Sequence, residues 1–579
     1  MLQTCSNRGS RCIRRALILI CIWCLIMVAV MQYHRAENEV YSSQHDPLTI
    51  DGNYMTIGGW DRGINQTHLS LLSKQDPLVN DSVKGYSSQE PLSSKILKNE
   101  QVLVDKRSGS RTDEELIEEI SNRAPNLPIA SWFKINGVKV TGTVDPKKTI
   151  FGCVPRYPNI FELEYNNIYW QTIRTSNGTF QLFGAYYDNR KLSRIGPAIR
   201  IVGMIDRIEP TVKTYCQLWY DDEKVPQIVD ILEYKYIWHS KWGNYKQGIY
   251  QPYVIACKIP QSHWKKSPPA SVSIVEKPCN TASNNLQVIY NKPDKKKEFA
   301  VCVKGLDFLY DDLSVRLIEW IELLGILGAD KIFFYNLQVH PNVTKVLNHY
   351  RKLDRIDVTP LTLPGGQPNI PGLQHIYLTK KTNNKRQNEL IPYNDCLYKH
   401  MYEYEYIALL DIDEVIMPIR DATWSELMRR VLPKALRIRN ETRASYNVRN
   451  VYFLDDLLHS HGFFDDVPRY MHMLQHVYRS KNFTKPNQYI KCFHNPERIV
   501  TLHNHFPLAC LGAGCTSYPI EIEDAQLQHY RVDCVKSLKK TCVQYRENSV
   551  MDKTIWRYKD ELVNRVINTL EKLGFYNLT

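Results

Sequence analysis

The chain has 579 residues, which is too long for one ordinary domain, so two or three domains are expected. A formal net charge of +13 is compatible with nucleic-acid binding, but the basic residues are scattered apart from short runs such as Lys295–Lys297. We interpret them as solvated surface, with an anionic phosphate or glycan partner as the lesser alternative.

The N-terminus predicts a membrane anchor. Several arginines in residues 1–15 precede the apolar run 16–32, which is short for a plasma-membrane span but suits a thin internal bilayer. The positive flank predicts a cytosolic tail over 1–15, a signal anchor over 16–32 and a lumenal remainder, where nucleic acid is not expected. A cleaved signal peptide is the competing interpretation, but no small-x-small cleavage site follows the run. Either interpretation puts most of the chain in the secretory lumen.

Glycosylation signals and cysteines agree with a lumenal location. Eleven of the fifteen cysteines follow the anchor, in a compartment that permits disulfides. Eleven is odd, so at least one thiol is free or pairs between chains, which leaves a disulfide-linked or non-covalent homodimer open. Seven asparagines have Ser or Thr two positions later and are candidate glycosylation sites: Asn65, Asn80, Asn177, Asn342, Asn440, Asn482 and Asn577.

Residues 33–128 are polar and predict a flexible stalk, and residues 129–295 predict a β-rich domain. The expected strands are rich in aromatic and β-branched residues, and turn residues separate them. They cover residues 161–165, 168–173, 180–187, 198–205, 214–220 and 228–236. The tryptophans of this region, Trp170, Trp219, Trp238 and Trp242, are more often core residues than a platform on which sugars stack.

Residues 296–579 predict an α/β domain, because strand and helix patterns alternate from Phe299 onward. Strands are expected at 299–303, 331–335, 356–361 and 406–410. Helices are expected from Ser314 to Gly328, at 343–350 and at 389–402. Such alternation predicts a parallel sheet with right-handed crossovers, in which ligands bind outside the carboxyl ends of the strands.

Two aspartates end the last of these strands. Residues i and i+2 of a strand point to the same side, so Asp411 and Asp413 can face one crevice. Their oxygens suit Mn2+ or Mg2+, which keep open positions for phosphate oxygens, as in a bound sugar nucleotide. For an arbitrary Asp-x-Asp the better interpretation is a solvated surface turn, but the preceding apolar strand favours a metal site here.

Several motifs together resemble glycosyltransferase family 92. They are Cys302-Val-Lys-Gly, Arg316-Leu-Ile-Glu-Trp320, the stretch from Gly328 to Asn336, the segments Gln387-Asn388 and Tyr393-Asn394-Asp395-Cys396, and Leu410-Asp411-Ile412-Asp413-Glu414. The resemblance covers roughly residues 298 to 531. It implies a GT-A (Rossmann-like) fold in a Golgi type II membrane enzyme. It also implies inverting, metal-dependent transfer of galactose from UDP-galactose to a glycan or glycoprotein, core fucose of N-glycans included.

We assign roles on that basis. Asp413 is the first choice for the metal, with Asp411 binding the metal or the nucleoside side. A third ligand is expected to be a histidine, and His503, His505 and His529 are the candidates, each of which is individually more often structural. Strand-end residues are expected to line the donor pocket: Val303, Lys304, Tyr335 and Asn336. Lys491 or Arg531 could face the diphosphate or lie on the surface.

An inverting transfer needs a general base for the acceptor hydroxyl. Acidic pairs follow the metal motif, and from them we name Asp456 and Asp466 as candidates, although such pairs are usually solvated loops. The four C-terminal cysteines, Cys510, Cys515, Cys534 and Cys542, are expected to form local disulfides, with a catalytic thiol as the minor alternative.

Other functions remain open at this point. One alternative is a lumenal glycan-binding protein or an inactive transferase, and another is a transferase that uses a different UDP-sugar. A Golgi sulfotransferase would share the topology, but the sequence has no Gly-rich phosphate loop of the kind that such enzymes use; Lys304-Gly305 is a poor substitute.

Overall fold

The computed structural model describes residues 112–132, 146, 149–512, 514–534, 540 and 542–575, all of which belong to the unit formed by residues 110–579. The predicted tail, anchor and most of the stalk, together with Asn65, Asn80 and Asn577, lie outside the described residues. Among the residues that are described, none forms a helix long and apolar enough to cross a membrane. The short helix α3 (Asp113–Arg123) begins at a capping box formed by Thr112 and Glu115.

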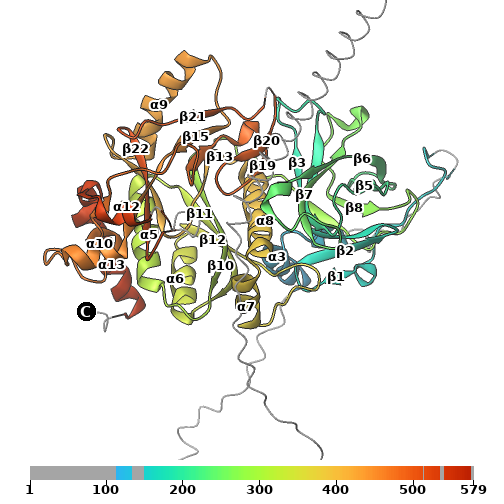
Figure 1. Ribbon diagram of the computed structural model, residues 1–579. Coiled ribbons are helices and arrows are strands. Elements are labelled where there is room, and N and C mark those ends of the chain that lie inside the picture. The colour runs from blue at the N-terminus through green and yellow to red at the C-terminus, as the bar shows by residue number, and fades with distance from the viewer. Residues whose placement is uncertain are drawn as a thin grey trace, which may run out of the picture. The chain divides into compact units, whose positions relative to one another are not determined.

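The first large sheet is a β-barrel (Figure 1). Its strands are β1 (Tyr165–Asn166), β2 (Trp170–Thr175), β3 (Gly178–Asp188), β4 (Ala198–Ile205), β5 (Tyr215–Trp219), β6 (Gln227–Tyr236), β7 (Gln251–Lys258), β8 (Ser271–Val275) and β9 (Leu286–Ile289). They pair in the order β1-β2-β3-β4-β7-β6-β5-β8-β9, and β9 returns to pair with β3, where Ala185 faces Val288. The predicted β-rich region is thereby confirmed, and its largely antiparallel strands close on themselves.

The sequence pattern was misleading at residues 161–165. Asn159 and Glu162 form a capping box there, so Ile160–Glu162 is a 3-10 turn and Phe161 is 93% exposed. Three of the four tryptophans, Trp170, Trp219 and Trp238, are core residues, as predicted, rather than parts of an exposed platform for sugars.

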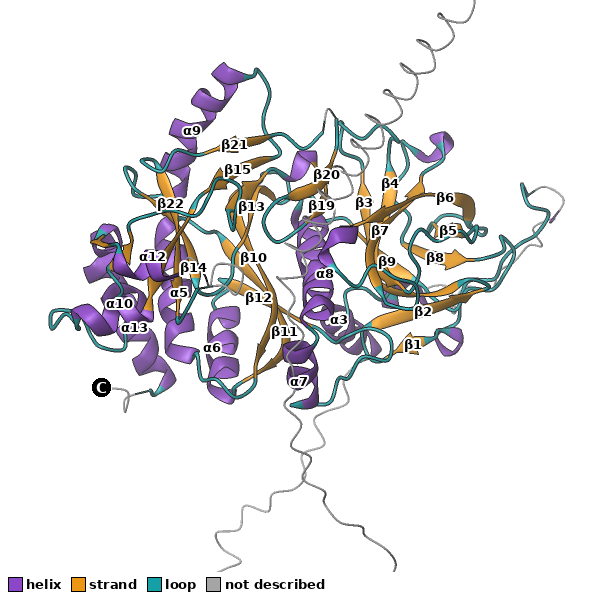
Figure 2. Cartoon of the chain, in the orientation of Figure 1, coloured by secondary structure: helices purple, strands orange, loops and turns teal. Residues whose placement is uncertain are grey.

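The second large sheet contains the predicted α/β alternation (Figure 2). Its strands, in spatial order, are β12 (Ile356–Pro360), β11 (Lys331–Val339), β10 (Lys297–Phe308), β13 (Tyr404–Leu409), β18 (Lys491–His494), β15 (Ser445–Val448) and β21 (Ser517–Pro519). The first four are parallel, and β18 runs antiparallel to β13 and β15. The helices between the parallel strands are α5 (Ser314–Leu327), α6 (Pro341–Lys352), α7 (Leu373–Lys380) and α8 (Thr382–His400). As predicted, α5 ends at Gly328, which adopts the left-handed conformation.

Smaller sheets extend the domain. One consists of β14 (Glu414–Pro418), β22 (Ala525–Arg531) and β16 (Asn450–Leu454); the others pair β17 (Tyr478–Ser480) with β23 (Ser549–Met551) and β19 (Ile499–Leu502) with β20 (Pro507–Cys510). The remaining α-helices are α9 (Trp424–Ile438), α10 (Asp455–His461), α11 (His472–Gln475), α12 (Cys542–Glu547) and α13 (Lys559–Leu573).

Helix α8 lies between the barrel and the second sheet (Figure 2). Trp170 and Tyr186 of the barrel share one buried cluster with Leu390 of α8 and with Ala300 and Ile407 of the sheet. The opposite face of the sheet is covered by α5, α6 and α13, whose apolar side chains belong to a separate core. Because α8 is buried on both sides, the polar residues on it are fixed in position.

Five disulfides connect ten of the eleven cysteines predicted to be lumenal. They join Cys153 to Cys279, Cys216 to Cys257, Cys302 to Cys396, Cys510 to Cys515 and Cys534 to Cys542. The eleventh, Cys492, is free and buried, so the odd thiol expected from the count does not lie at the surface of this chain. Multiple disulfides indicate a domain of the secretory pathway.

Candidate functional site

Asp411 and Asp413 lie in the turn that connects β13 to β14. The backbone N–H of Glu414 donates to the Asp411 carbonyl, and the Asp411 N–H donates to the Glu414 carboxylate, each at 3.0 Å. The side chain of Asp411 is 17% exposed, whereas that of Asp413 is 41% exposed. The turn therefore keeps one carboxylate inside and presents the other at the surface of the site.

Two lysines surround Asp411. Its carboxylate lies 3.1 Å from the ammonium of Lys304 on β10 and 3.7 Å from that of Lys491 on β18. Burial would raise the pKa of Asp411, but Lys304 and then Lys491 outweigh it and hold this pKa well below its usual range. Asp411 is consequently ionised, and charges of the protein itself balance it.

Lys491 is fully buried and does not reach the surface. Its ammonium lies 3.0 Å from the Glu414 carboxylate and donates to the side-chain oxygen of Asn504 at 2.6 Å. Burial raises the pKa of Glu414, and Lys491 opposes that shift. Lys491 thus places one buried positive charge beside the carboxylates of both Asp411 and Glu414.

His529 is the candidate histidine that lies against Asp413. Strand β22 pairs with β14 so that His529 is opposite Glu414, and its Nε2 is 3.4 Å from Asp413 Oδ2. The Arg531 guanidinium lies 3.3 Å from the same Nε2, and Nδ1 lies 3.0 Å from the side-chain oxygen of Asn450. A carboxylate oxygen and an imidazole nitrogen that face each other are a donor set that fits a divalent cation.

The other two histidines make different contacts. His505 Nδ1 donates to the Ile490 carbonyl at 2.9 Å, and His503 packs on Trp242 of the barrel with ring centroids 4.5 Å apart. Burial lowers the pKa of His503 to about 4 and that of His505 to about 3. Both rings are neutral at pH 7. His503 contacts the barrel and His505 contacts Ile490, and neither ring forms a hydrogen bond with the two aspartates.

A small open pocket lies at the carboxyl ends of the parallel strands. Its lining comes from β10, β11, the segment after β12, α7 and α8, and consists of Gly305, Asp307, Leu337, Leu361, Leu378, Lys385, Asn388 and Glu389. Glu389 Oε1 is 3.7 Å from the same Lys304 ammonium that neutralises Asp411, so the pocket and the acidic turn share one cation.

The four strand-end candidates divide into two pairs. Lys304 faces the acidic turn, and the side-chain oxygen of Asn336 is buried without a hydrogen-bond partner among the described residues, as expected where a ligand would supply one. Val303, in contrast, lies in the apolar core, and the Tyr335 hydroxyl donates to the buried carboxylate of Asp395.

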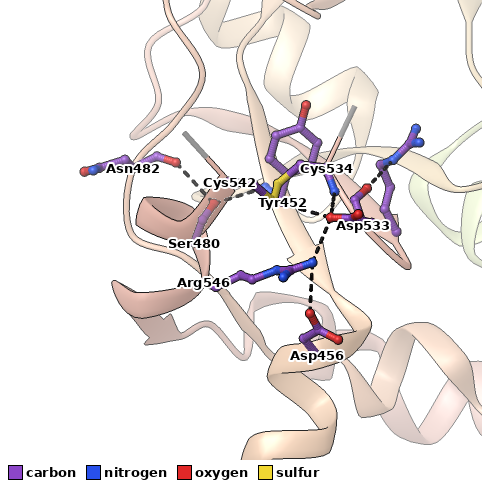
Figure 3. The surroundings of a disulfide bond; sticks show 9 residues. Tyr452, Asp456, Ser480, Asn482, Asp533, Cys534, Cys542 and Arg546 are labelled. Carbon is purple, nitrogen blue, oxygen red and sulfur yellow. Dashed lines mark hydrogen bonds and ion pairs between the residues drawn. A yellow bond between two sulfur atoms is a disulfide. The ribbon is translucent and has the colours of Figure 1, made fainter. Parts of the chain in front are cut away.

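The two candidate bases, Asp456 and Asp466, are exposed, and each forms an ion pair with a basic side chain. Asp456 on α10 contacts Arg546 at 3.0 Å, beside Asp533 and the Cys534–Cys542 disulfide (Figure 3). Asp466 lies 2.7 Å from Lys559. The carboxylates of the two side chains are 51% and 58% exposed. These positions fit the solvated-loop interpretation at least as well as a role in catalysis.

Residues 297–566 match the sequence profile of glycosyltransferase family 92. The chain contains a glycosyltransferase family 92 domain. A search of curated proteins returned no match. The family 92 domain begins with β10 and extends into α13, so it includes the parallel strands, the acidic turn and β22. Membership implies a nucleotide-sugar donor and a sugar acceptor.

Sequence reasoning missed two residues that lie beside the acidic turn. Glu389 contacts Lys304, and the Tyr393 hydroxyl lies 3.4 Å from Asp411 Oδ1. The two residues are four positions apart on α8, a spacing that places them on one helix face, and this spacing could have indicated them.

Proposed function

We propose that this protein is an inverting, metal-dependent glycosyltransferase with a GT-A fold that transfers galactose from UDP-galactose to a glycan. The observation that carries the proposal is the pairing of Asp413 with Nε2 of His529, next to a pocket at the ends of parallel strands. Galactose as the donor sugar rests on the resemblance to family 92, and another UDP-sugar is the nearest alternative.

The strand order supports the GT-A assignment. The first strand, β10, lies between β11 and β13, with β12 beyond β11, which is the 3-2-1-4 order of a doubly wound nucleotide-binding half. The acidic turn follows the fourth strand, at the edge where ligands bind in such sheets.

Asp413 and His529 would hold Mn2+ or Mg2+, and Asp411 would lie in the more buried part of the same turn. When bound, the cation would neutralise the charge that develops on departing UDP. Lys304 places a second positive charge at the same edge of the sheet, where it can attract the diphosphate. Asn336 offers an unpaired oxygen to a donor hydroxyl.

Glu389 is our preferred base, ahead of Asp456 and Asp466. It lines the pocket, and its carboxylate lies 3.7 Å from the Lys304 ammonium, beside the acidic turn. In an inverting transfer the base takes the proton of the acceptor hydroxyl, the hydroxyl oxygen bonds to the anomeric carbon, and UDP leaves with the electrons of the bond that breaks.

We also propose that the enzyme is a single-pass type II protein of the Golgi membrane. The disulfides support a secretory compartment, and the arginine-flanked run at residues 16–32 supports an anchor.

A donor screen with Mn2+ tests the proposal. We expect full-length protein to turn over UDP-galactose, Asp413→Ala to lose this activity, and Asp465→Ala, which changes an exposed aspartate, to retain it. Turnover that persists in both Asp413→Ala and EDTA would exclude the metal role. Glycan binding without turnover of any donor would instead favour a glycan-binding protein.

A further inference from the structure

Three potential metal ligands lie together away from the acidic turn. Asp455 begins α10, directly after β16, and His472 and His476 lie at the two ends of α11. One donor atom from each of these residues lies within 4.8 Å of the others. The cluster is partly to fully buried, with His476 the most enclosed.

The hydrogen bonds of the cluster fix where the lone pairs point. His476 Nδ1 is 2.6 Å from the backbone carbonyl of His472, which can only accept, so Nδ1 carries a proton. In the neutral ring Nε2 then carries a lone pair, yet it lies 2.9 Å from Asp455 Oδ1. Two lone pairs at this distance repel each other unless a proton or a metal ion lies between them.

A protonated His476 would satisfy only part of the cluster. His472 Nε2 is buried without a hydrogen-bond partner among the described residues and lies 3.6 Å from the same Asp455 oxygen. The two imidazole rings are 4.1 Å apart, and a second cationic ring would be repelled by the first. A divalent cation would satisfy all three donor atoms at once.

The cluster lies across β22 from the acidic turn. Adjacent residues of a strand point to opposite faces, and His529 of β22 faces Asp413. The next residue, Tyr530, faces the cluster, with its ring centroid 6.1 Å from that of His472 and 6.2 Å from that of His476. The two sets of ligands are therefore separate.

We propose that Asp455, His472 and His476 form a second metal site, which binds Zn2+. Two imidazole nitrogens and one carboxylate oxygen are a ligand set typical of Zn2+, with a fourth position open to water. Nitrogen donors favour Zn2+ over Mn2+ and Mg2+, which prefer oxygen.

The bound ion would fasten the segment between α10 and α11 to the core. The backbone N–H groups of Met473 and Leu474 in α11 donate at 3.0 Å to the buried carboxylate of Glu319 on α5. A metal bridge from α11 to Asp455 would extend this anchoring to the end of β16. The role is structural, so it does not depend on the proposed transfer reaction.

Metal content and Co2+ absorption of the full-length protein test the site. In an Asp413→Ala background, which removes the proposed donor-side metal, we expect about one tightly bound Zn2+ per chain. Co2+ in its place should give the visible absorption of a four-coordinate nitrogen and oxygen site. His472→Gln and His476→Gln should each abolish this binding, whereas His459→Gln, which changes an exposed histidine of α10, should not.

Asp455→Asn guards against a folding artefact, because it keeps the side-chain shape and removes the charge. It should weaken Zn2+ binding at least tenfold while near-ultraviolet circular dichroism stays native. The proposal is overturned if the Asp413→Ala protein binds no Zn2+. It is equally overturned if natively folded His472→Gln and Asp455→Asn proteins bind as much Zn2+ as their parent.

Discussion

The ammonium nitrogen of Lys304 lies 3.1 Å from the carboxylate of Asp411. Lys304 belongs to β10 and Asp411 follows β13, more than 100 residues later, but the two strands are adjacent and parallel. Burial opposes the charged form of Lys304, and Asp411 and then Glu389 more than compensate and raise its pKa above the usual value. The family 92 domain therefore contains a permanent cation at the edge where the donor is proposed to bind.

Removal of this cation should impair catalysis. We expect Lys304→Met to lower kcat/KM for the sugar nucleotide by roughly 100-fold or more, the usual effect of deleting one group that stabilises developing charge. Lys331→Met is the matched control, because Lys331 is at the amino end of β11 and pairs with the exposed carboxylates of Asp354 and Asp357. Equal activity of the two variants would argue against a role of Lys304 at the donor.

Lys491 should matter chiefly for stability. Lys491→Met leaves the buried carboxylate of Glu414 without its partner, so we expect a loss of about 3–5 kcal/mol in the free energy of unfolding. Adding Glu414→Gln should recover part of the loss, with a coupling energy of about 1–3 kcal/mol in denaturant titrations. Arg439→Met, at an exposed ion pair with Glu441, should have a much smaller effect. Strictly additive effects would mean that the two buried charges do not interact.

Buried histidines should make the protein less stable in weak acid. His494 is fully buried, and burial lowers its pKa to about 3 from the ordinary 6.5. The unfolded chain therefore binds a proton as the pH falls below about 6.5, while the folded chain does not. His494 should contribute a decrease of up to about 1.4 kcal/mol in unfolding free energy per pH unit between roughly pH 6 and pH 4.

Urea denaturation at several pH values measures this slope. His494→Leu, which cannot take up a proton, should reduce the slope by about the contribution of one site, and His459→Gln should leave it unchanged because His459 is exposed. An unchanged slope in His494→Leu would show that His494 is protonated in the folded protein too.

The disulfides should differ in their effect on stability. The Cys302–Cys396 bond joins β10 to α8 across a sequence separation of 94, whereas Cys510–Cys515 spans 5. Chain-entropy arguments give about 4–5 kcal/mol for the long loop and about 2 kcal/mol for the short one. We expect the double Cys→Ser variant of the first pair to lower the melting temperature clearly more than that of the second. The reverse order would mean that strain or residual structure decides the effect.

The sequence by itself was sufficient for the regular parts of the family 92 domain. The strand and helix patterns from Phe299 to Leu410 predicted all four parallel strands and the helices α5, α6 and α8, but not α7, because these periodicities reflect local burial. The motif Asp411-Ile412-Asp413 could likewise be recognised as a candidate metal site, since an apolar strand that ends in acidic residues is a local feature of the sequence. The odd number of cysteines predicted at least one thiol that is free or pairs between chains, and Cys492 is free.

Only the tertiary structure decided which distant residues meet. Three histidines were equivalent in sequence, and the pairing of β14 with β22 selected His529 as the one opposite Glu414 and beside Asp413. Glu389 looked like an ordinary helix residue until the packing of α8 against β10 brought it to Lys304. Periodicity records which side of an element is buried. It contains no information on which element lies against that side, and strand pairing and helix packing over hundreds of residues supply that information.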